Sequence, residues 1–65
     1  MMKVIEVLAQ SNKSWDDATR KAVAEVAKTV KNIRSVYVQD FSAVVKGADI
    51  TEYRVNLKIT FEVER

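Results

Sequence analysis

The closing segment of the chain, residues 53–63, alternates apolar and polar residues without interruption. The odd-numbered positions are apolar: Tyr53, Val55, Leu57, Ile59, Phe61 and Val63. The even-numbered positions are polar: Arg54, Asn56, Lys58, Thr60 and Glu62. A period of two over this length predicts a long β-strand. One face of that strand should be buried, and the other should meet water, a ligand or another subunit.

The preceding residues predict one helix between two further strands. Residues 3–10 are rich in β-branched residues and predict the first strand. A helix is expected from Trp15 to Lys31, and a second strand over residues 35–45. Gly47, the only glycine, supplies the permissive backbone for a turn before the last strand. The order β-α-β-β predicts an α+β fold, with a three-stranded, mainly antiparallel sheet wrapped around one helix.

The start of the helix carries several local signals. Ser14 followed by Asp17 is a capping pattern, and Asp16 and Asp17 place negative charge at the positive end of the helix dipole. Lys28 and Lys31 would sit near the other end, and Asn32 would end the helix. The apolar positions fall on one half of the helix, with Trp15 at the centre as a predicted core anchor: Trp15, Ala18, Ala22, Val23, Val26, Ala27, Val30 and Ile33.

In the second strand, alternation assigns the side chains to two faces. Val36 and Val38 are predicted on one face. The other face is predicted to hold Tyr37, Gln39, Phe41, Ala43 and Val45.

The short chain limits how much apolar surface can be buried. The 65 residues form a single predicted domain, residues 1–65, without Cys or His. Disulfide bonds are therefore excluded, and a structural zinc site is disfavoured. Self-association is the remaining common way to stabilise so small a core, so we expect a homo-oligomer.

Composition also bears on partners and location. The net charge is +2, with Lys and Arg interspersed among Asp and Glu, which does not favour nucleic-acid binding. No segment approaches the ~20 apolar residues of a membrane span, so no membrane partner is expected. The amino-terminal segment lacks the features of a signal peptide, and a cytoplasmic location is the default expectation.

Catalysis is not expected, because the chain has no imidazole base and no thiolate nucleophile. A single glycine also rules out a P-loop and a GxGxxG turn. Two sets of charged residues remain as binding candidates. Asp16 and Asp17 could ligate a hard cation or simply stabilise the helix start. Arg54 and Lys58, on one strand face, could bind an anion or form a solvated or subunit-pairing face.

Across nearly its whole length the sequence resembles the dodecin family. The resemblance rests on the opening VIEVLAQSNKSWDDA, on KTVKNIRSVYV at the end of the predicted helix, and on the closing EYRVNLKITFEVE. It implies a hollow homododecamer that binds flavins in pairs between subunits and performs no catalysis. The flavin would be riboflavin or flavin mononucleotide.

The resemblance also implies site residues, and this chain departs from the family at two of them. Ser35 stands where typical members have a Trp that stacks on the flavin ring, and Arg54 stands where they have a Gln that hydrogen-bonds its edge. Asp40 matches an acidic position near the flavin side chain, while Val36 and Tyr37 flank the altered stacking position. Tyr37 could offer a substitute ring.

At SWDDA and NIRSVYV the sequence is similar to a dodecin subgroup that lacks this Trp and is associated with calcium. The resemblance does not identify metal ligands. A phosphate-bearing ligand such as flavin mononucleotide or coenzyme A would also suit Arg54 and Lys58. The sequence thus leaves two alternatives: a flavin-binding dodecin, or an assembly that holds calcium or a phosphate-bearing ligand instead.

Overall fold

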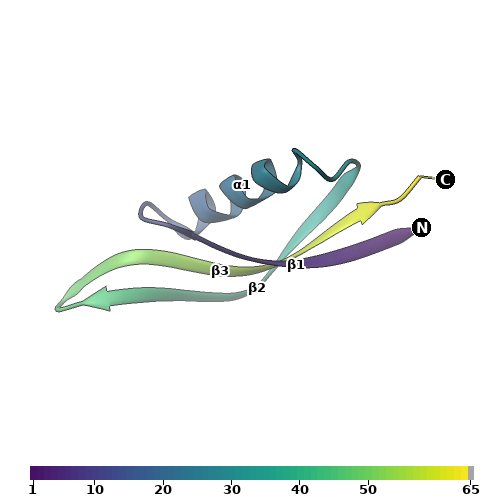
Figure 1. Cartoon of the computed structure of the whole chain (residues 1–65). Helices are drawn as coiled ribbons and strands as arrows, with labels where there is room; N and C mark the ends of the chain where they lie inside the picture. Colours follow the sequence, from purple (N-terminus) through teal and green to yellow (C-terminus); the bar gives the residue numbers. More distant parts are fainter. Residues whose placement is uncertain (65) are drawn as a thin grey trace.

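The computed structural model describes residues 1–64 (Figure 1); Arg65, the last residue of the predicted domain, lies outside the described residues. Four elements follow one another: β1 (Met2–Ser11), α1 (Trp15–Val26), β2 (Ile33–Lys46) and β3 (Asp49–Glu62). The sheet order is β1-β3-β2, and β3 pairs antiparallel with both neighbours. The predicted α+β class and β-α-β-β order are confirmed.

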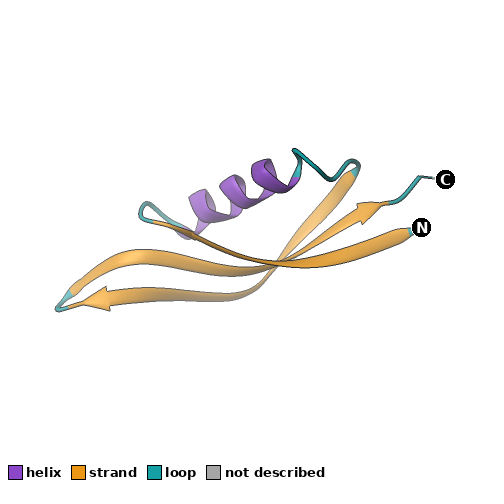
Figure 2. Ribbon diagram, viewed as in Figure 1, coloured by secondary structure: helices purple, strands orange, loops and turns teal. Residues whose placement is uncertain are grey.

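The molecule has two layers, with α1 lying over one face of the sheet (Figure 2). The opposite face, called the outer face below, is covered by no other element of residues 1–64. The β2–β3 hairpin extends past the loop that leads into α1, and both chain ends lie at the opposite end of the sheet (Figure 1). The chain therefore spans 51 × 19 × 12 Å.

The core lies between α1 and the central strand β3. Val55, Leu57 and Ile59 are buried at 2%, 0% and 0% exposure, as the alternation predicts. Facing them are two buried alanines of the helix, Ala18 and Ala22, whose small side chains let the helix approach the sheet closely.

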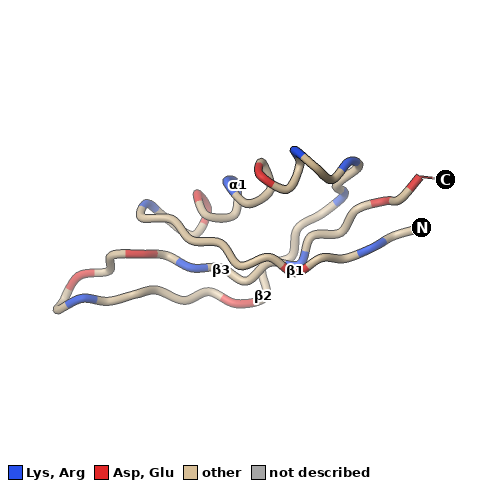
Figure 3. The backbone as a smooth tube through the Cα atoms, in the orientation of Figure 1, with Lys and Arg blue, Asp and Glu red and all other residues tan. Residues whose placement is uncertain are grey.

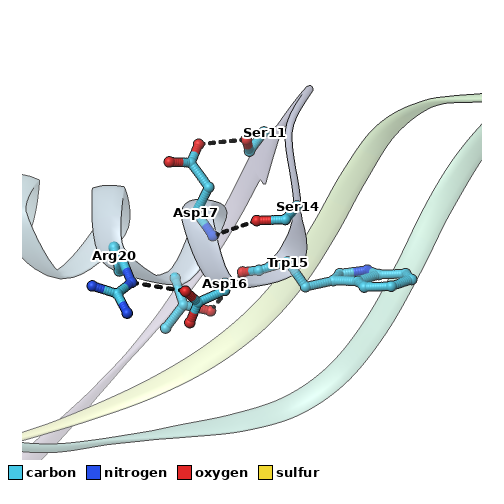
Figure 4. A network of polar contacts seen from close by, with 7 residues as sticks. Ser11, Ser14, Trp15, Asp16, Asp17 and Arg20 are labelled. Carbon is cyan, nitrogen blue, oxygen red and sulfur yellow. Dashed lines mark hydrogen bonds and ion pairs between the residues drawn. The ribbon is translucent and has the colours of Figure 1, made fainter.

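The helix begins where the sequence predicts. The Ser14 hydroxyl accepts a hydrogen bond from the Asp17 backbone N–H at 2.9 Å, which satisfies one donor of the first turn (Figure 4). Trp15 points toward β2 and β3, where its indole N–H donates to the Ser42 carbonyl at 2.8 Å. The Trp15 ring packs edge-on against Tyr53 with 4.8 Å between ring centroids. The predicted core-anchoring role of Trp15 is confirmed.

The predicted end of the helix at Lys31 is wrong, because α1 ends at Val26. The backbone N–H of Thr29 bonds to the Val26 carbonyl, three residues back, as in the tighter turns that close a helix. Asn32 then has a φ of 63°, a left-handed conformation that Asn tolerates well. These residues carry the chain back to the sheet, where Ile33 pairs with Phe61. No helix within residues 1–64 is long and apolar enough to cross a membrane.

The predicted faces of β2 are also partly wrong, because the strand is interrupted by bulges. The register passes from Val38, opposite Leu57, directly to Asp40, opposite Asn56, so Gln39 is an extra residue. Beyond it, Phe41 lies opposite Val55 on the helix-covered face. Tyr37 lies opposite Lys58 on the outer face, so Tyr37 and Phe41 occupy opposite faces rather than one.

Candidate ligand-binding site

The outer face of the sheet carries polar side chains in register across three strands. Two neighbouring rows of paired residues cross the sheet. Each row contains one residue from β1, one from β3 and one from β2: Leu8–Asn56–Asp40 and Gln10–Arg54–Ser42. These positions alternate with Val55 and Leu57 of the core, so they point away from α1. The two rows therefore form one continuous patch of six residues.

A hollow of about 370 Å³ lies over this patch, lined by all six of these residues. We call it the outer-face hollow. Its volume falls within the range of pockets that hold small molecules, roughly 300–1,000 Å³. Apolar atoms make up most of its lining, in keeping with an organic ligand.

Asn56 lines the hollow, but its amide oxygen is buried. The Oδ1 atom of Asn56 is buried and has no hydrogen-bond partner among the described residues. Leaving a buried acceptor unpaired costs about 1–3 kcal/mol.

Asp40 and Arg54 bring opposite charges to the same patch. Within residues 1–64 neither of them takes part in an ion pair. The Asp40 carboxylate is an acceptor and the Arg54 guanidinium is only a donor. Both side chains are exposed and free to meet a polar ligand. The structure thus brings together two of the residues that the family resemblance implied.

The other residues implied by the resemblance lie elsewhere in the subunit. Ser35 and Tyr37 are exposed on the outer face, where their partners in β3 are Thr60 and Lys58. Thr60 is six residues from Arg54 along the strand, which separates Ser35 from Arg54 by about 20 Å. A single bound flavin could touch both positions only if they came from different subunits.

Val36 has the opposite orientation, because it pairs with the buried Ile59 on the helix-covered face. It does not share a surface with Ser35 in one subunit. Its role, like that of the other implied site residues, stays a prediction.

Lys58 and Arg54 share the outer face as predicted but are not adjacent. They are four residues apart in β3, about 14 Å between Cα atoms, with Asn56 between them. Lys58 does not line the hollow. Charged residues of both signs are spread along the helix and the strands (Figure 3), so Arg54 is a local cation rather than part of a basic surface.

The candidate cation ligands at the helix start already have protein partners. Asp16 accepts from Arg20 at 2.8 Å, and Asp17 accepts from the buried Ser11 hydroxyl at 2.6 Å (Figure 4). Lys21 lies 3.2 Å from Asp17. The Ser11 hydroxyl, with help from Lys21, lowers the pKa of Asp17 below its ordinary value of 3.8.

These contacts match the predicted helix-stabilising role. Calcium requires six to eight oxygen ligands. Residues 1–64 contain no group of three or more acidic, His or Cys side chains that could hold a metal. Asp16 and Asp17 are therefore not part of a larger cluster of such side chains within residues 1–64.

Besides Ala9 and Val55, which also line the hollow, sequence reasoning missed its four outward-pointing residues Leu8, Gln10, Ser42 and Asn56. The alternation of β1 and β3 could have indicated Leu8, Gln10 and Asn56, because these residues are even-numbered, like the other residues of the two strands that face outward. Ser42 had no such signal, because the bulge at Gln39 moves the later residues of β2 to the other face.

The family model described as Dodecin matches residues 1–64. The chain is 31% identical over 61 residues to the calcium dodecin of Mycobacterium tuberculosis. The aligned region covers 94% of this chain and 86% of that protein.

Solved structures agree with the sequence match. The dodecin of Streptomyces coelicolor superposes with a TM-score of 0.94 at 25% identity, covering 100% of this chain and 93% of the other. A mutant of the T. thermophilus dodecin gives a TM-score of 0.94 at 25% identity, and the superposition covers 100% of this chain and 97% of the other. The M. tuberculosis calcium dodecin, described as calcium-chelating, gives a TM-score of 0.85 at 30% identity, and the superposition covers 98% of this chain and 91% of the other. The fold, the sequence match and the family model agree, and the chain belongs to the dodecin family.

Proposed function

We propose that this chain is a non-catalytic subunit that assembles into a homododecamer and holds a small ligand in the outer-face hollow, against a neighbouring subunit. Flavin, as riboflavin or flavin mononucleotide, is the first candidate ligand, by analogy with the family. The observation that carries the proposal is the outer face itself, which combines exposed apolar side chains with a hollow that includes the charged groups of Asp40 and Arg54.

Surface area supports assembly. The chain exposes 4859 Å², whereas a compact monomer of its mass would expose about 4,200 Å². The radius of gyration is 13.3 Å, against roughly 11 Å for a compact chain of this length. Among the described residues, the large apolar side chains with high exposure include Val4, Leu8, Tyr37, Phe41, Val45 and Ile50. Contact between copies would bury this surface.

The lining of the hollow supports a ligand. It offers an apolar wall at Leu8 and two charges at Asp40 and Arg54 that form no ion pair within residues 1–64. Ser35, in the place of the stacking Trp, removes one aromatic contact worth about 1–3 kcal/mol per ring. We therefore expect weaker flavin binding than in dodecins that keep the Trp, by about 5- to 150-fold per ring.

Two measurements test the proposal. The native mass of the purified protein should be about 89 kDa, the value for twelve chains of 7.4 kDa. Titration of riboflavin and flavin mononucleotide should quench flavin fluorescence. A stable 7.4 kDa species would contradict the assembly, and absence of quenching at tens of micromolar protein would contradict flavin binding. Ser35→Trp should raise flavin affinity, and Lys46→Trp, at the exposed end of the same strand and outside the hollow, is the control for adding an indole elsewhere.

The alternative is an assembly that has lost tight flavin binding and holds calcium or a phosphate-bearing ligand such as coenzyme A. Arg54 favours the phosphate, since a guanidinium can bind phosphate oxygens through two parallel hydrogen bonds. Calcium would need further oxygen ligands, such as backbone carbonyls, water or groups from a neighbouring subunit, because residues 1–64 contain no group of three or more acidic, His or Cys side chains. Calorimetric titration of the assembled protein with calcium and with coenzyme A would distinguish these ligands from flavin.

A further inference from the structure

We infer that Tyr37 supplies an aromatic contact to the planar ring of a ligand in the outer-face hollow, by turning its side chain over the edge of the hollow from the neighbouring row of the sheet. This inference rests on the proposed function, because it assigns a further binding residue to the same hollow. The ring concerned is that of flavin, the first candidate ligand.

Tyr37 is the one aromatic residue on the outer face among residues 1–64. The other four lie on the helix-covered side of the sheet: Trp15, Phe41, Tyr53 and Phe61. Tyr37 is 64% exposed and packs against no other aromatic ring of the described residues. A large apolar ring without a packing partner is therefore available to cover a ligand.

Tyr37 lies one row away from the hollow. Its partner in β3 is Lys58, two residues from Asn56 of the hollow, so the two rows are about 7 Å apart along the strand. In β2 the extra residue Gln39 lies between Tyr37 and Asp40. A bulge bends its strand, increases the local twist and changes the direction of neighbouring side chains. Tyr37 is thus next to the hollow without lining it.

A change of rotamer brings the Tyr37 ring to the hollow. Side chains of a strand stand nearly perpendicular to the sheet and lean along the strand direction, with two common values of χ1. Exposed side chains exchange rotamers within picoseconds to nanoseconds. When Tyr37 leans toward Asp40, its ring covers the step between the two rows and forms a wall of the hollow.

The opposite wall is Leu8 on β1, which is 79% exposed and lines the hollow. β1 and β2 flank β3, so their backbones are about 10 Å apart across the sheet. A ligand ring needs about 3.5–4 Å to the carbon atoms on each of its faces. Side chains that lean inward from β1 and β2 therefore leave room for one planar ring above β3, with Leu8 on one face and Tyr37 on the other.

This contact would act on the ring of the ligand and on no other part of it. Riboflavin and flavin mononucleotide share the same ring, so both should lose the same factor of affinity when the Tyr37 ring is removed. Stacking of a base on an aromatic side chain corresponds to about 5- to 150-fold in affinity. Calcium has no aromatic face, and any binding of calcium should not depend on Tyr37.

The test is titration of the assembled full-length protein with riboflavin and flavin mononucleotide. Tyr37→Leu should weaken both by about 5- to 150-fold, and Tyr37→Phe, which keeps a ring, should retain most of the affinity. Phe41→Leu is the matched control. Phe41 is an aromatic residue of the same strand with a nearly equal exposure of 63%, but it lies on the helix-covered face. Its replacement should leave flavin affinity unchanged.

A measurement on the unsubstituted sequence covers the case in which Tyr37→Leu fails to assemble. The chain has two tyrosines, Tyr37 and Tyr53, so labelling with fluorotyrosine gives one fluorine NMR signal for each, and Tyr37→Phe assigns them. Saturation with riboflavin should shift the Tyr37 signal and leave the Tyr53 signal in place.

Two results would overturn the inference and leave the proposed function standing: flavin binding with an unshifted Tyr37 signal, or equal flavin affinity in Tyr37→Leu and the unsubstituted protein. Absence of flavin binding by the unsubstituted assembly would overturn the inference together with the assignment of flavin as the ligand.

Discussion

Two leucines in this fold permit a sharp test of where its stability originates. Leu57 is fully buried in β3, with Val7 and Val38 as its cross-strand partners, whereas Leu8 is 79% exposed on the outer face of β1. Replacing either by Ala removes the same atoms. Leu57→Ala should cost about 2.7–5 kcal/mol, because it removes apolar burial and leaves a cavity. The subunit fold has about 3–10 kcal/mol in total at this chain length.

Leu8→Ala should change the intrinsic stability of the subunit by no more than about 0.5 kcal/mol. If the outer face is a contact between copies, its effect should appear instead as a loss of assembly that depends on protein concentration.

The assay is urea unfolding followed by far-ultraviolet circular dichroism at several protein concentrations, with native mass measured in parallel. Should Leu57→Ala fail to fold, Ile59→Val provides a milder change at another fully buried position, with an expected cost of about 0.5–1.5 kcal/mol. Equal, small losses for Leu57→Ala and Leu8→Ala at every concentration would refute the assignment of the core to the odd-numbered face of β3.

Three further predictions concern local features. Trp15→Phe should destabilise the fold by about 1–2 kcal/mol in chemical denaturation, because the indole bond to the Ser42 carbonyl is lost; unchanged stability would show that this bond is not formed in solution. The lowered pKa of Asp17 stabilises the fold above pH 3.8, and this contribution is lost as pH falls through the folded-state pKa. Asp17→Asn should therefore reduce stability at neutral pH and flatten the acid limb of a stability–pH curve, and Ser11→Ala should raise the Asp17 pKa in an NMR titration; no change in either would contradict the contact. Deletion of Gln39 should preserve the fold, because removing the extra residue restores regular alternation with the same strand partners; loss of the native circular dichroism spectrum would show that the bulge is required.

The sequence was a reliable guide wherever local chemistry alone sets the structure. The alternation of β3 predicted its buried face, and Ser14 predicted the helix start, because a period of two and a capping hydroxyl act over a few residues. The helix end was wrong by five residues. The helix ends at Val26, and the residues that follow bring Ile33 into register with Phe61 in the sheet, a pairing that the sequence pattern of the helix does not contain.

For the candidate site, the sequence determined which chemical groups exist on this chain, and the family resemblance singled out Asp40 and Arg54. Only the tertiary structure decided that these two share one hollow with Asn56, Leu8 and Gln10, while Ser35 lies about 20 Å away. The physical reason is strand register. A single extra residue at Gln39 reverses which side chains of β2 face outward, and pairing across three strands brings together positions that are far apart in the sequence.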